Sequence, residues 1–374
     1  MKKRARILHI NCNYLGTALH QTMIRTLNSF TENQVFCPYY EGANCVITPD
    51  SNVIAALCFK KRDRIVFSYK QSKIIREIQK CLDIKRFDVI HAYTLFTDGN
   101  VAMNLSEKFG CPFVVAVRAT DVDAFFRYRP WLIQRGTEIM RKASAVFFLS
   151  QIYKEKVLQK YVSEKYRQEI EKKSYVIPNG IDSFWLENPP PEKKKEISKE
   201  KDIRVIFAGT IIKRKNIPMI QKALEEVRKK GYRVSLTVVG KAIDQKEFRL
   251  IQSDTETCCY PSQPKEKLID FYRKSDIFCM PSWQETFGLV YAEAMSQGLP
   301  VIYSKGQGFD GQFPEGQVGF SVNSASAKSV AEGIIGVIEN YSQIAPNCIP
   351  SAARFDWHDI CQQYLEIYDR VQNS

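Results

Sequence analysis

The chain has 374 residues, of which 25% are charged, and a formal net charge of +13 at pH 7. This length suffices for two domains with separate cores. The first residues lead directly into a strand-like segment without a signal-peptide apolar region, and no apolar run approaches the 18 or so residues that a membrane span needs. We therefore expect no segment of this chain to span a bilayer.

Two further features of the composition bear on compartment and partners. The eleven cysteines are odd in number and lack metal-ligand spacing, which favours the reducing cytosol. Residues 1–190 hold 29 Lys and Arg against 18 Asp and Glu, whereas residues 191–374 hold 25 against 23. The basic character therefore belongs to the first half of the chain.

The first half alternates apolar segments with stretches of helical periodicity. The predicted strands are Ile7–Asn11, Val53–Leu57, Asp88–Ala92, Phe113–Val117, Ala145–Leu149 and Tyr175–Ile177. Helices are predicted near 17–29, 70–82, 97–109, 131–143 and 151–160. This βα repeat predicts a parallel sheet.

The helical stretch near residues 70–82 is basic and amphipathic. Ile74, Ile75, Ile78 and Leu82 form an apolar stripe, and the same region is rich in basic residues. Such a face can rest on anionic lipid, where each basic residue contributes about 1 kcal/mol at best. A solvated helix face in a basic protein is the alternative, because charge patterning has low specificity. The basic residues of this region are Lys60, Lys61, Arg62, Arg64, Lys70, Lys73, Arg76 and Lys80.

A second βα series follows a linker. Residues 187–201 are rich in proline and charge, with almost nothing to bury, and are predicted to connect two domains. The strands predicted after them are Arg204–Ala208, Val234–Val239, Asp276–Met280 and Pro300–Tyr303, and the last helix is Trp357–Val371.

The segment after the strand Arg204–Ala208 has the features of an anion site. Gly209 and Thr210 open a basic loop that contains Arg214 and Lys215, and a helix start follows at Pro218. A strand, a basic glycine loop and a helix start together favour phosphate binding.

Residues 280–300 carry the most specific pattern in the chain. Glu285 lies on a loop after an apolar strand, and Glu293 lies in the helix that starts near Gly288. The free amides of Phe287, Gly288 and Leu289 carry the positive end of the helix dipole, which suits a diphosphate or a sugar hydroxyl. A carboxylate in the following turn can accept hydrogen bonds from a ribose diol. The block predicts a site for a nucleotide-linked sugar.

This block, residues 177–182 (Ile-Pro-Asn-Gly-Ile-Asp) and the loop from Gly209 to Asn216 together resemble glycosyltransferase family 4. The resemblance implies the GT-B fold, an α/β architecture of two facing Rossmann-like βαβ domains with a C-terminal helix that crosses back to the first. The implied boundaries are an acceptor-binding domain at 1–186, a linker at 187–201, a donor-binding domain at 202–352 and a crossover helix at 353–374.

The resemblance also implies roles for individual residues. Lys215 matches the lysine that contacts the donor diphosphate, and Glu285 is assigned to the catalytic set. Thr210 stands where the family usually has arginine, and Arg214 is a candidate for the missing cation. Gly240 and Gly16 match turns that face the nucleotide and the donor phosphates. Arg118 and Asp121 match the family's His-Gly-x-Asp segment near the sugar, with arginine in place of histidine, so the identity of any base stays open.

The expected activity is retaining transfer of a sugar from a nucleotide diphosphate to a hydroxyl of a glycan or lipid-linked glycan, in surface polysaccharide biosynthesis. No cofactor, metal or nucleic acid is expected. Asp121 and Asp123 form an Asp-x-Asp triplet that holds a metal in the other large glycosyltransferase fold, but the basic loop already supplies counter-charge. The expected location is the cytoplasm, with the basic half against the inner membrane face. The alternatives are a sugar-nucleotide epimerase of the same fold and a non-enzymatic RNA-binding protein, for which no recognisable module is present.

Overall fold

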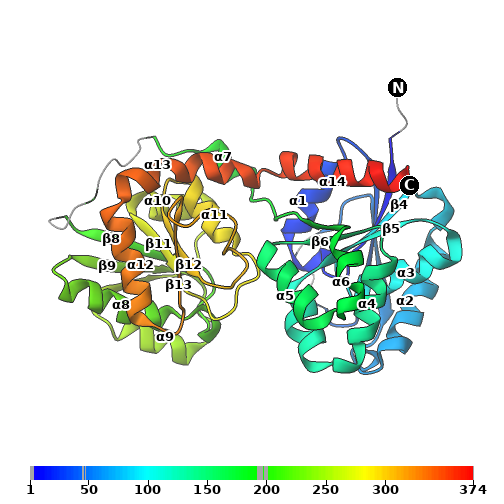
Figure 1. The fold of residues 1–374 in the computed structure, drawn as a ribbon, viewed down its shortest axis with the longest axis horizontal. Helices are drawn as coiled ribbons and strands as arrows, with labels where there is room; N and C mark the ends of the chain where they lie inside the picture. Colours follow the sequence, from blue (N-terminus) through cyan, green and yellow to red (C-terminus); the bar gives the residue numbers. More distant parts are fainter. Residues whose placement is uncertain (1–3, 44–45, 47, 192–196, 198–200, 374) are drawn as a thin grey trace. The chain divides into compact units, whose positions relative to one another are not determined.

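A computed structural model describes residues 4–43, 46, 48–191, 197 and 201–373 (Figure 1). The chain divides into two compact units. Unit 1 comprises Met1–Leu149, Tyr153–Gly180 and Trp357–Ser374, and unit 2 comprises Ser150–Ile152 and Ile181–Asp356. Each unit is built on one parallel sheet, as the βα repeat predicted.

Unit 1 contains a seven-stranded sheet in the order β3-β2-β1-β4-β5-β6-β7. Its strands are β1 (Arg6–Ile10), β2 (Glu32–Tyr40), β3 (Val53–Phe59), β4 (Val89–Ala92), β5 (Phe113–Val117), β6 (Ala145–Phe148) and β7 (Ser174–Val176). Its helices are α1 (Ala18–Leu27), α2 (Phe67–Cys81), α3 (Thr97–Phe109), α4 (Ile133–Lys142), α5 (Gln151–Tyr161), α6 (Glu164–Glu171) and α14 (Trp357–Gln372). The strand order reverses between β1 and β4, as in a Rossmann fold.

The two faces of this sheet bury two separate cores, because successive side chains of a strand point in opposite directions. Leu8 of β1 and Val115 of β5 pack against α2, α3 and α4. Ile7 and Val114, their neighbours in sequence, belong to a second core that includes α1 and α14. Both faces are therefore covered by helices, as an all-parallel sheet requires.

The C-terminal helix α14 belongs to unit 1, where it lies beside α1 (Figure 1). The Tyr368 hydroxyl is 2.6 Å from Nδ1 of His91 on β4, and Ile360, Tyr364 and Tyr368 are buried. Burial lowers the pKa of His91 well below its usual value, so this histidine is neutral and structural. The predicted return of the last helix to the first half of the chain is confirmed.

Strand β2 is absent from the sequence prediction, and it contains Pro38, a residue type that is rare in internal strands. The register explains how the proline is tolerated. β1 pairs with β2 only as far as Phe36, whereas β3 continues beside Pro38 and Tyr39. Pro38 therefore lies where the strand has one neighbour, and its missing N–H removes no bond to β1.

Unit 2 contains a six-stranded sheet in the order β10-β9-β8-β11-β12-β13. Its strands are β8 (Ile203–Ala208), β9 (Val234–Val239), β10 (Thr257–Tyr260), β11 (Ile277–Met280), β12 (Val301–Ser304) and β13 (Gly319–Val322). Its helices are α7 (Ser183–Glu187), α8 (Ile217–Lys229), α9 (Gln245–Gln252), α10 (Lys265–Lys274), α11 (Leu289–Ser296), α12 (Ala327–Glu339) and α13 (Tyr341–Ala352).

The two edge strands of this sheet, β10 and β13, were not among the predicted strands. Each has four residues and only one neighbouring strand. In β10, half-buried residues alternate with exposed ones. Such short edge strands carry little apolar signal, which is why the pattern missed them. Most of the predicted linker, residues 192–196 and 198–200, lies outside the described residues.

Candidate functional site

Unit 2 has a reversal of strand order between β8 and β11. From β8 the sheet continues to β9 and β10, and from β11 it continues to β12 and β13. Ligands of open α/β sheets bind at the carboxyl ends of the strands where the order reverses. Lys215 follows β8 and Glu285 follows β11, so the strongest motif residues lie at this position.

An ion pair joins these two residues. The Lys215 Nζ is 2.5 Å from an Oε atom of Glu285, and each side chain is only 12% exposed. The guanidinium of Arg214 lies 3.8 Å from the same carboxylate and donates a hydrogen bond to the Gln284 carbonyl. The structure therefore brings two cations and one carboxylate together, which leaves a net positive charge for an anionic ligand.

The loop that carries Lys215 approaches the loop after β9 closely. Gly209 donates its backbone N–H to the Val239 carbonyl, and Gly240 donates to the Tyr260 carbonyl. A Cβ atom on Gly240 would lie 1.8 Å from the Gly209 carbonyl oxygen. Glycine at 240 is therefore required by contact between two backbones. Thr210, directly after Gly209, is half-buried.

The Glu285 loop is held by the loop after β12. The Gln307 side chain accepts a hydrogen bond from the Glu285 backbone N–H at 3.0 Å. Gly308 donates its N–H to the Glu285 carbonyl at 2.9 Å. The carboxylate of Glu285 also accepts the backbone N–H of Thr286 at 3.1 Å. These bonds fix the direction of the Glu285 side chain, a role for the 307–308 segment that the sequence did not reveal.

Helix α11 begins directly after this loop. Gly288 precedes it with a φ of 75°, and Leu289 is its first residue. Phe287 is 2% exposed and packs edge-on against Phe355, which anchors the helix start in the core. The first amides of any helix lack acceptors within the helix, so this end can bind an anion or an oxygen of a ligand.

Glu293 has different neighbours from Glu285. Burial raises the pKa of Glu293 to about 7, the nearby charge of Asp182 raises it further, and the Tyr272 hydroxyl opposes the shift. Asp182 itself caps α7 and pairs with Lys265 at 2.5 Å. Glu293 therefore lies against Tyr272 on the α7 side of its helix, and near neutral pH it can carry a proton.

The candidate residues of unit 1 lie after β1 and β5. Gly16 is exposed at the end of a short 3-10 turn, Tyr14–Gly16, and an added Cβ would meet no atom within 4 Å. Arg118 follows β5, and its guanidinium donates to the Tyr93 carbonyl at 3.3 Å and to the Asn179 side chain at 3.2 Å. Both residues lie at the carboxyl edge of the sheet.

Asp121 is buried, and its carboxylate accepts three backbone N–H groups. These belong to Leu95 at 3.0 Å, Phe96 at 3.2 Å and Arg118 at 2.9 Å. Burial raises the pKa of Asp121 to about 6 against these hydrogen bonds. The carboxylate therefore ties the loop after β4 to the loop after β5, a positioning role in addition to the one that its motif suggests.

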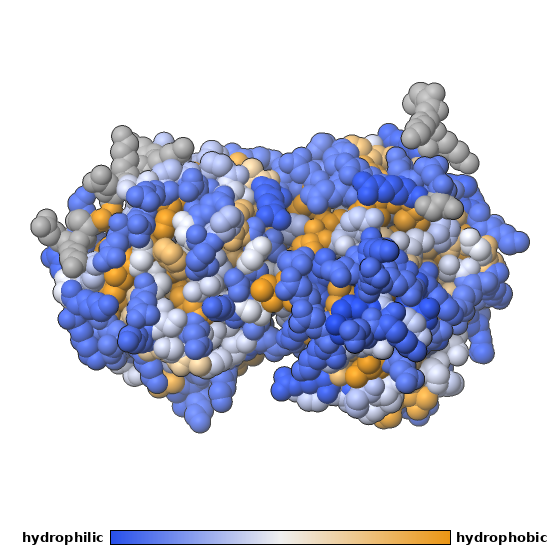
Figure 2. All heavy atoms as spheres, in the orientation of Figure 1, coloured by the Kyte–Doolittle hydropathy of each residue, from blue (hydrophilic) through white to orange (hydrophobic). Residues whose placement is uncertain are grey.

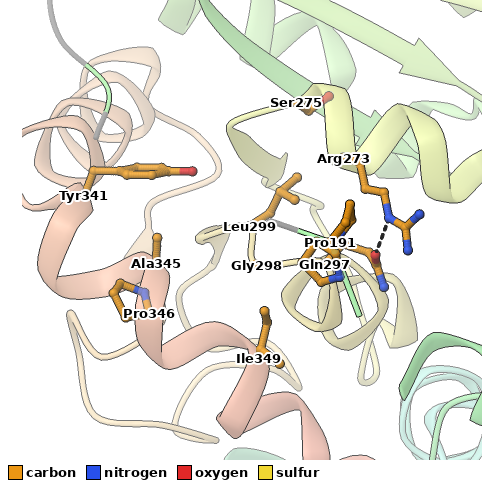
Figure 3. Close-up of a pocket in the computed structure, with 11 residues that line it drawn as sticks. Pro191, Arg273, Ser275, Gln297, Gly298, Leu299, Tyr341, Ala345, Pro346 and Ile349 are labelled. Atoms are coloured by element: carbon orange, nitrogen blue, oxygen red, sulfur yellow. Dashed lines mark hydrogen bonds between the residues drawn. The ribbon is translucent and has the colours of Figure 1, made fainter. Parts of the chain in front are cut away.

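Two of the pockets in the described structure bear on these sites. One, of about 340 Å³, is lined by Ser275 before β11 and Leu299 before β12, together with Tyr341 and Ile349 (Figure 3). It is therefore at the amino ends of the strands, on the opposite edge from Lys215. The other, of about 270 Å³, lies in unit 1 at the carboxyl ends of the strands and is lined by Cys12 after β1 and Thr94 after β4.

Within the described ranges, no group of three or more His, Cys, Asp and Glu residues is arranged to hold a metal ion. In the same ranges, no helix combines the length and apolar character that crossing a bilayer demands.

Comparisons with known proteins point to one family. The model of "Glycosyltransferase Family 4" matches residues 28–183, and the model of "Glycosyl transferases group 1" matches residues 190–354. A capsular polysaccharide biosynthesis glycosyltransferase from Staphylococcus aureus is 28% identical over 173 residues, 44% of this chain. The match also covers only 44% of that relative's own length.

Solved structures agree in fold over nearly the whole chain. A sucrose-phosphate synthase from Thermosynechococcus elongatus has a TM-score of 0.73 at 19% identity, covering 98% of this chain and 99% of that one. An Anabaena protein in complex with UDP and glucose has a TM-score of 0.67 at 17% identity, covering 98% and 100%. At such low identity these likenesses show the two-sheet fold alone.

Proposed function

Because this chain belongs to glycosyltransferase family 4, the glycosyl transferases group 1, whose models match both of its halves, we propose that it transfers a sugar from a nucleotide-diphosphate donor. The donor binds unit 2 at the carboxyl ends of β8 and β11, and the acceptor hydroxyl belongs to a glycan or lipid-linked glycan that binds unit 1. The observation that carries the proposal is the buried pair of Lys215 and Glu285 at the point where the strand order reverses.

The chemistry assigns a role to each group. Lys215, with Arg214 beside it, neutralises charge that builds on the departing diphosphate, and stabilising such charge is usually the largest catalytic contribution. Glu285 orients the ammonium group of Lys215 and accepts a hydrogen bond from a hydroxyl of the sugar. The amides at the start of α11 hold the diphosphate or the sugar.

The reaction follows from these roles. The bond between the sugar C1 and the diphosphate oxygen breaks, the acceptor oxygen bonds to C1, and the acceptor proton passes to the departing phosphate. Attack on the face from which the phosphate leaves retains the configuration at C1. Such a route requires no carboxylate nucleophile of the glycosidase type.

Donor binding is tested by thermal unfolding of the purified chain with UDP-, GDP- and ADP-sugars. UDP-glucose comes first, because a structure of the Anabaena neighbour is a complex with UDP-glucose. A donor at 100 times its Kd stabilises the native state by about 2.7 kcal/mol. We expect one nucleotide class to raise the Tm, and no response to any of them would contradict the proposal.

Product analysis then separates transfer from epimerisation. A transferase releases a nucleoside diphosphate and forms a glycoside, whereas an epimerase of the same fold yields an isomeric nucleotide sugar. The capsular polysaccharide relative supports transfer in surface polysaccharide biosynthesis.

Membrane association of the basic half stays a prediction, but the apolar stripe of α2 is not the surface that would contact the membrane. The apolar stripe of α2 does not face outward: Ile74 and Ile78 are fully buried in the core of unit 1. The exposed candidates precede the helix, where Ile65 is 82% and Val66 54% exposed, next to Lys60 and Lys61. On the face shown in Figure 2, hydrophilic residues predominate and apolar residues form small groups among them.

Vesicle sedimentation tests this surface. The double substitution Lys60→Gln and Lys61→Gln is expected to weaken binding to vesicles with 30% phosphatidylserine by up to roughly 30-fold, since each basic residue contributes about 1 kcal/mol at best. The matched control is Lys229→Gln with Lys230→Gln, an exposed pair at the end of α8 in unit 2. Equal losses of vesicle binding in both double variants would indicate unspecific charge attraction, and no binding by the parent chain would refute the prediction.

A further inference from the structure

The pocket of unit 1 gathers positive charge at the point where the strand order of its sheet reverses. It lies at the carboxyl ends of β1 and β4, and three basic residues line it: Arg64, Lys70 and Arg129. They come from the turn before α2, from α2 itself and from the segment before α4. The fold thus brings together cations that are up to 65 positions apart in the sequence.

Lys70 is the most buried of the three basic residues that line this pocket. It is only 8% exposed, and its ammonium group donates a hydrogen bond to the Thr97 hydroxyl at 3.0 Å. Burial lowers the pKa of Lys70, and the charges of Arg64 and Arg129 add to this, against the opposing effect of Cys12 and Asp98. Arg64 and Arg129 are therefore each close enough to repel the Lys70 ammonium group, and a bound anion would relieve that repulsion.

The two arginines are positioned by aromatic rings. The guanidinium carbon of Arg64 lies 5.1 Å from the centre of the Tyr40 ring, and that of Arg129 lies 5.1 Å from the centre of the Phe125 ring. Stacking on a ring leaves the N–H groups of a guanidinium available. Within the described part of the chain, no ion pair joins Arg64, Lys70 or Arg129 to a carboxylate.

Two acidic residues lie near these cations, but their oxygens are already engaged. Asp98 accepts the Cys12 backbone N–H at 3.2 Å and the Thr94 hydroxyl at 3.0 Å, and burial raises its pKa to about 7. Asp121 accepts three backbone N–H groups, as described above. Among the residues that line the pocket, three are basic and one, Asp121, is acidic, so the lining keeps an excess of positive charge.

The amino end of α3 adds to this attraction. Thr97, whose hydroxyl accepts the Lys70 hydrogen bond, is the first residue of this 13-residue helix and lines the pocket. The positive end of the helix dipole therefore reinforces the ammonium group beside it.

Resting on the proposed function, we propose that the acceptor bears a phosphate group and that Lys70, Arg129 and Arg64 bind this phosphate in unit 1. A phosphate carries close to two negative charges and offers three acceptor oxygens, which three cations and a hydroxyl can satisfy. A carboxylate carries one charge and two oxygens, so it matches this set less well. The phosphate belongs either to a soluble phosphorylated sugar or to the diphosphate of a lipid-linked glycan.

Calorimetric titration with defined probes tests this proposal. The probes are glucose 6-phosphate for the soluble source and farnesyl diphosphate in detergent for the lipid source, with glucose, glucuronate and farnesol as comparisons. We expect one phosphate probe to bind, with an affinity that falls as salt is added. The substitutions Lys70→Met and Arg129→Gln should each weaken that binding at least 10-fold.

The matched control is Arg127→Gln. Arg127 is an exposed arginine two positions from Arg129 and lies over the Tyr128 ring, but it does not line the pocket. This variant should bind the probe as the parent chain does. Because Lys70 is buried, Lys70→Met can lower stability, whereas Arg129 is half-buried and its substitution keeps the test decisive.

The outcomes separate cleanly. Phosphate binding that is lost in Arg129→Gln and kept in Arg127→Gln supports the proposal, and the better probe identifies the source. Binding of glucuronate or glucose as tight as that of glucose 6-phosphate, or unchanged binding in Arg129→Gln, overturns it. Stabilisation by a nucleotide sugar is measured on the same variants and should persist in them. A failure of donor binding in unit 2 is thereby distinguished from a failure of phosphate binding in unit 1.

Discussion

Replacing Lys215 with methionine is expected to lower kcat/KM for sugar transfer by about 100- to 1000-fold, the loss typical when one donor that stabilises transition-state charge is removed. Methionine keeps much of the side-chain volume beside Met280, whose sulfur lies 3.4 Å from the Lys215 ammonium group. The measurement is steady-state kinetics with the donor identified by thermal unfolding.

The matched control is Lys213→Met, in the same short turn. Lys213 is exposed and is not joined to Glu285 by an ion pair in the described structure, so its substitution should leave turnover nearly unchanged. A Lys215→Met variant that retains near-normal turnover would contradict the assignment of Lys215 to the donor site.

Stability must be separated from activity in this experiment. Lys215→Met leaves the Glu285 carboxylate, 12% exposed, without its nearest cation, and stranding a buried charge costs several kcal/mol in the limiting case. Adding Glu285→Gln removes the stranded charge. The double variant should therefore recover Tm relative to Lys215→Met but not recover turnover.

The second large effect is expected from Gly308→Ala. A Cβ atom at this position would lie 1.5 Å from the Thr286 carbonyl oxygen, a contact between two backbones that no rotamer can relieve. The loop that carries Glu285 must then move, which is expected to cost about 1–3 kcal/mol of unfolding free energy. A displacement near 1 Å at a reacting centre costs roughly 100-fold in rate.

Gly306→Ala is the control for this variant. Gly306 has a φ of 72°, but an added Cβ would meet no atom within 4 Å. Its substitution should cost about 1 kcal/mol of backbone strain and preserve most of the activity. Chemical denaturation and initial rates on both variants decide the matter, and equal behaviour of the two would show that the contact at Thr286 does not position Glu285.

Local patterns were enough to predict most of the architecture. The sequence pattern identified the strands with continuous apolar runs, such as Phe113–Val117, and the helices between them. Each of these elements is buried on at least one face, and burial leaves a periodic pattern of apolar residues in the sequence. The pattern missed β2, where Pro38 lies beyond the end of the β1 pairing, and the four-residue edge strands of unit 2. Whether a proline is tolerated depends on which strand lies beside it, and a sequence does not state that.

The sequence by itself determined the two βα series, the basic first half, and the motif residues Lys215 and Glu285, because these depend on neighbours along the chain. Only the tertiary structure decided that Arg214 lies beside that pair, that Asp121 ties two loops and that the α2 stripe is buried. Only it joined Arg64, Lys70 and Arg129 in one pocket. These contacts link residues far apart in sequence, and their geometry exists only once the sheet has set the order of its strands.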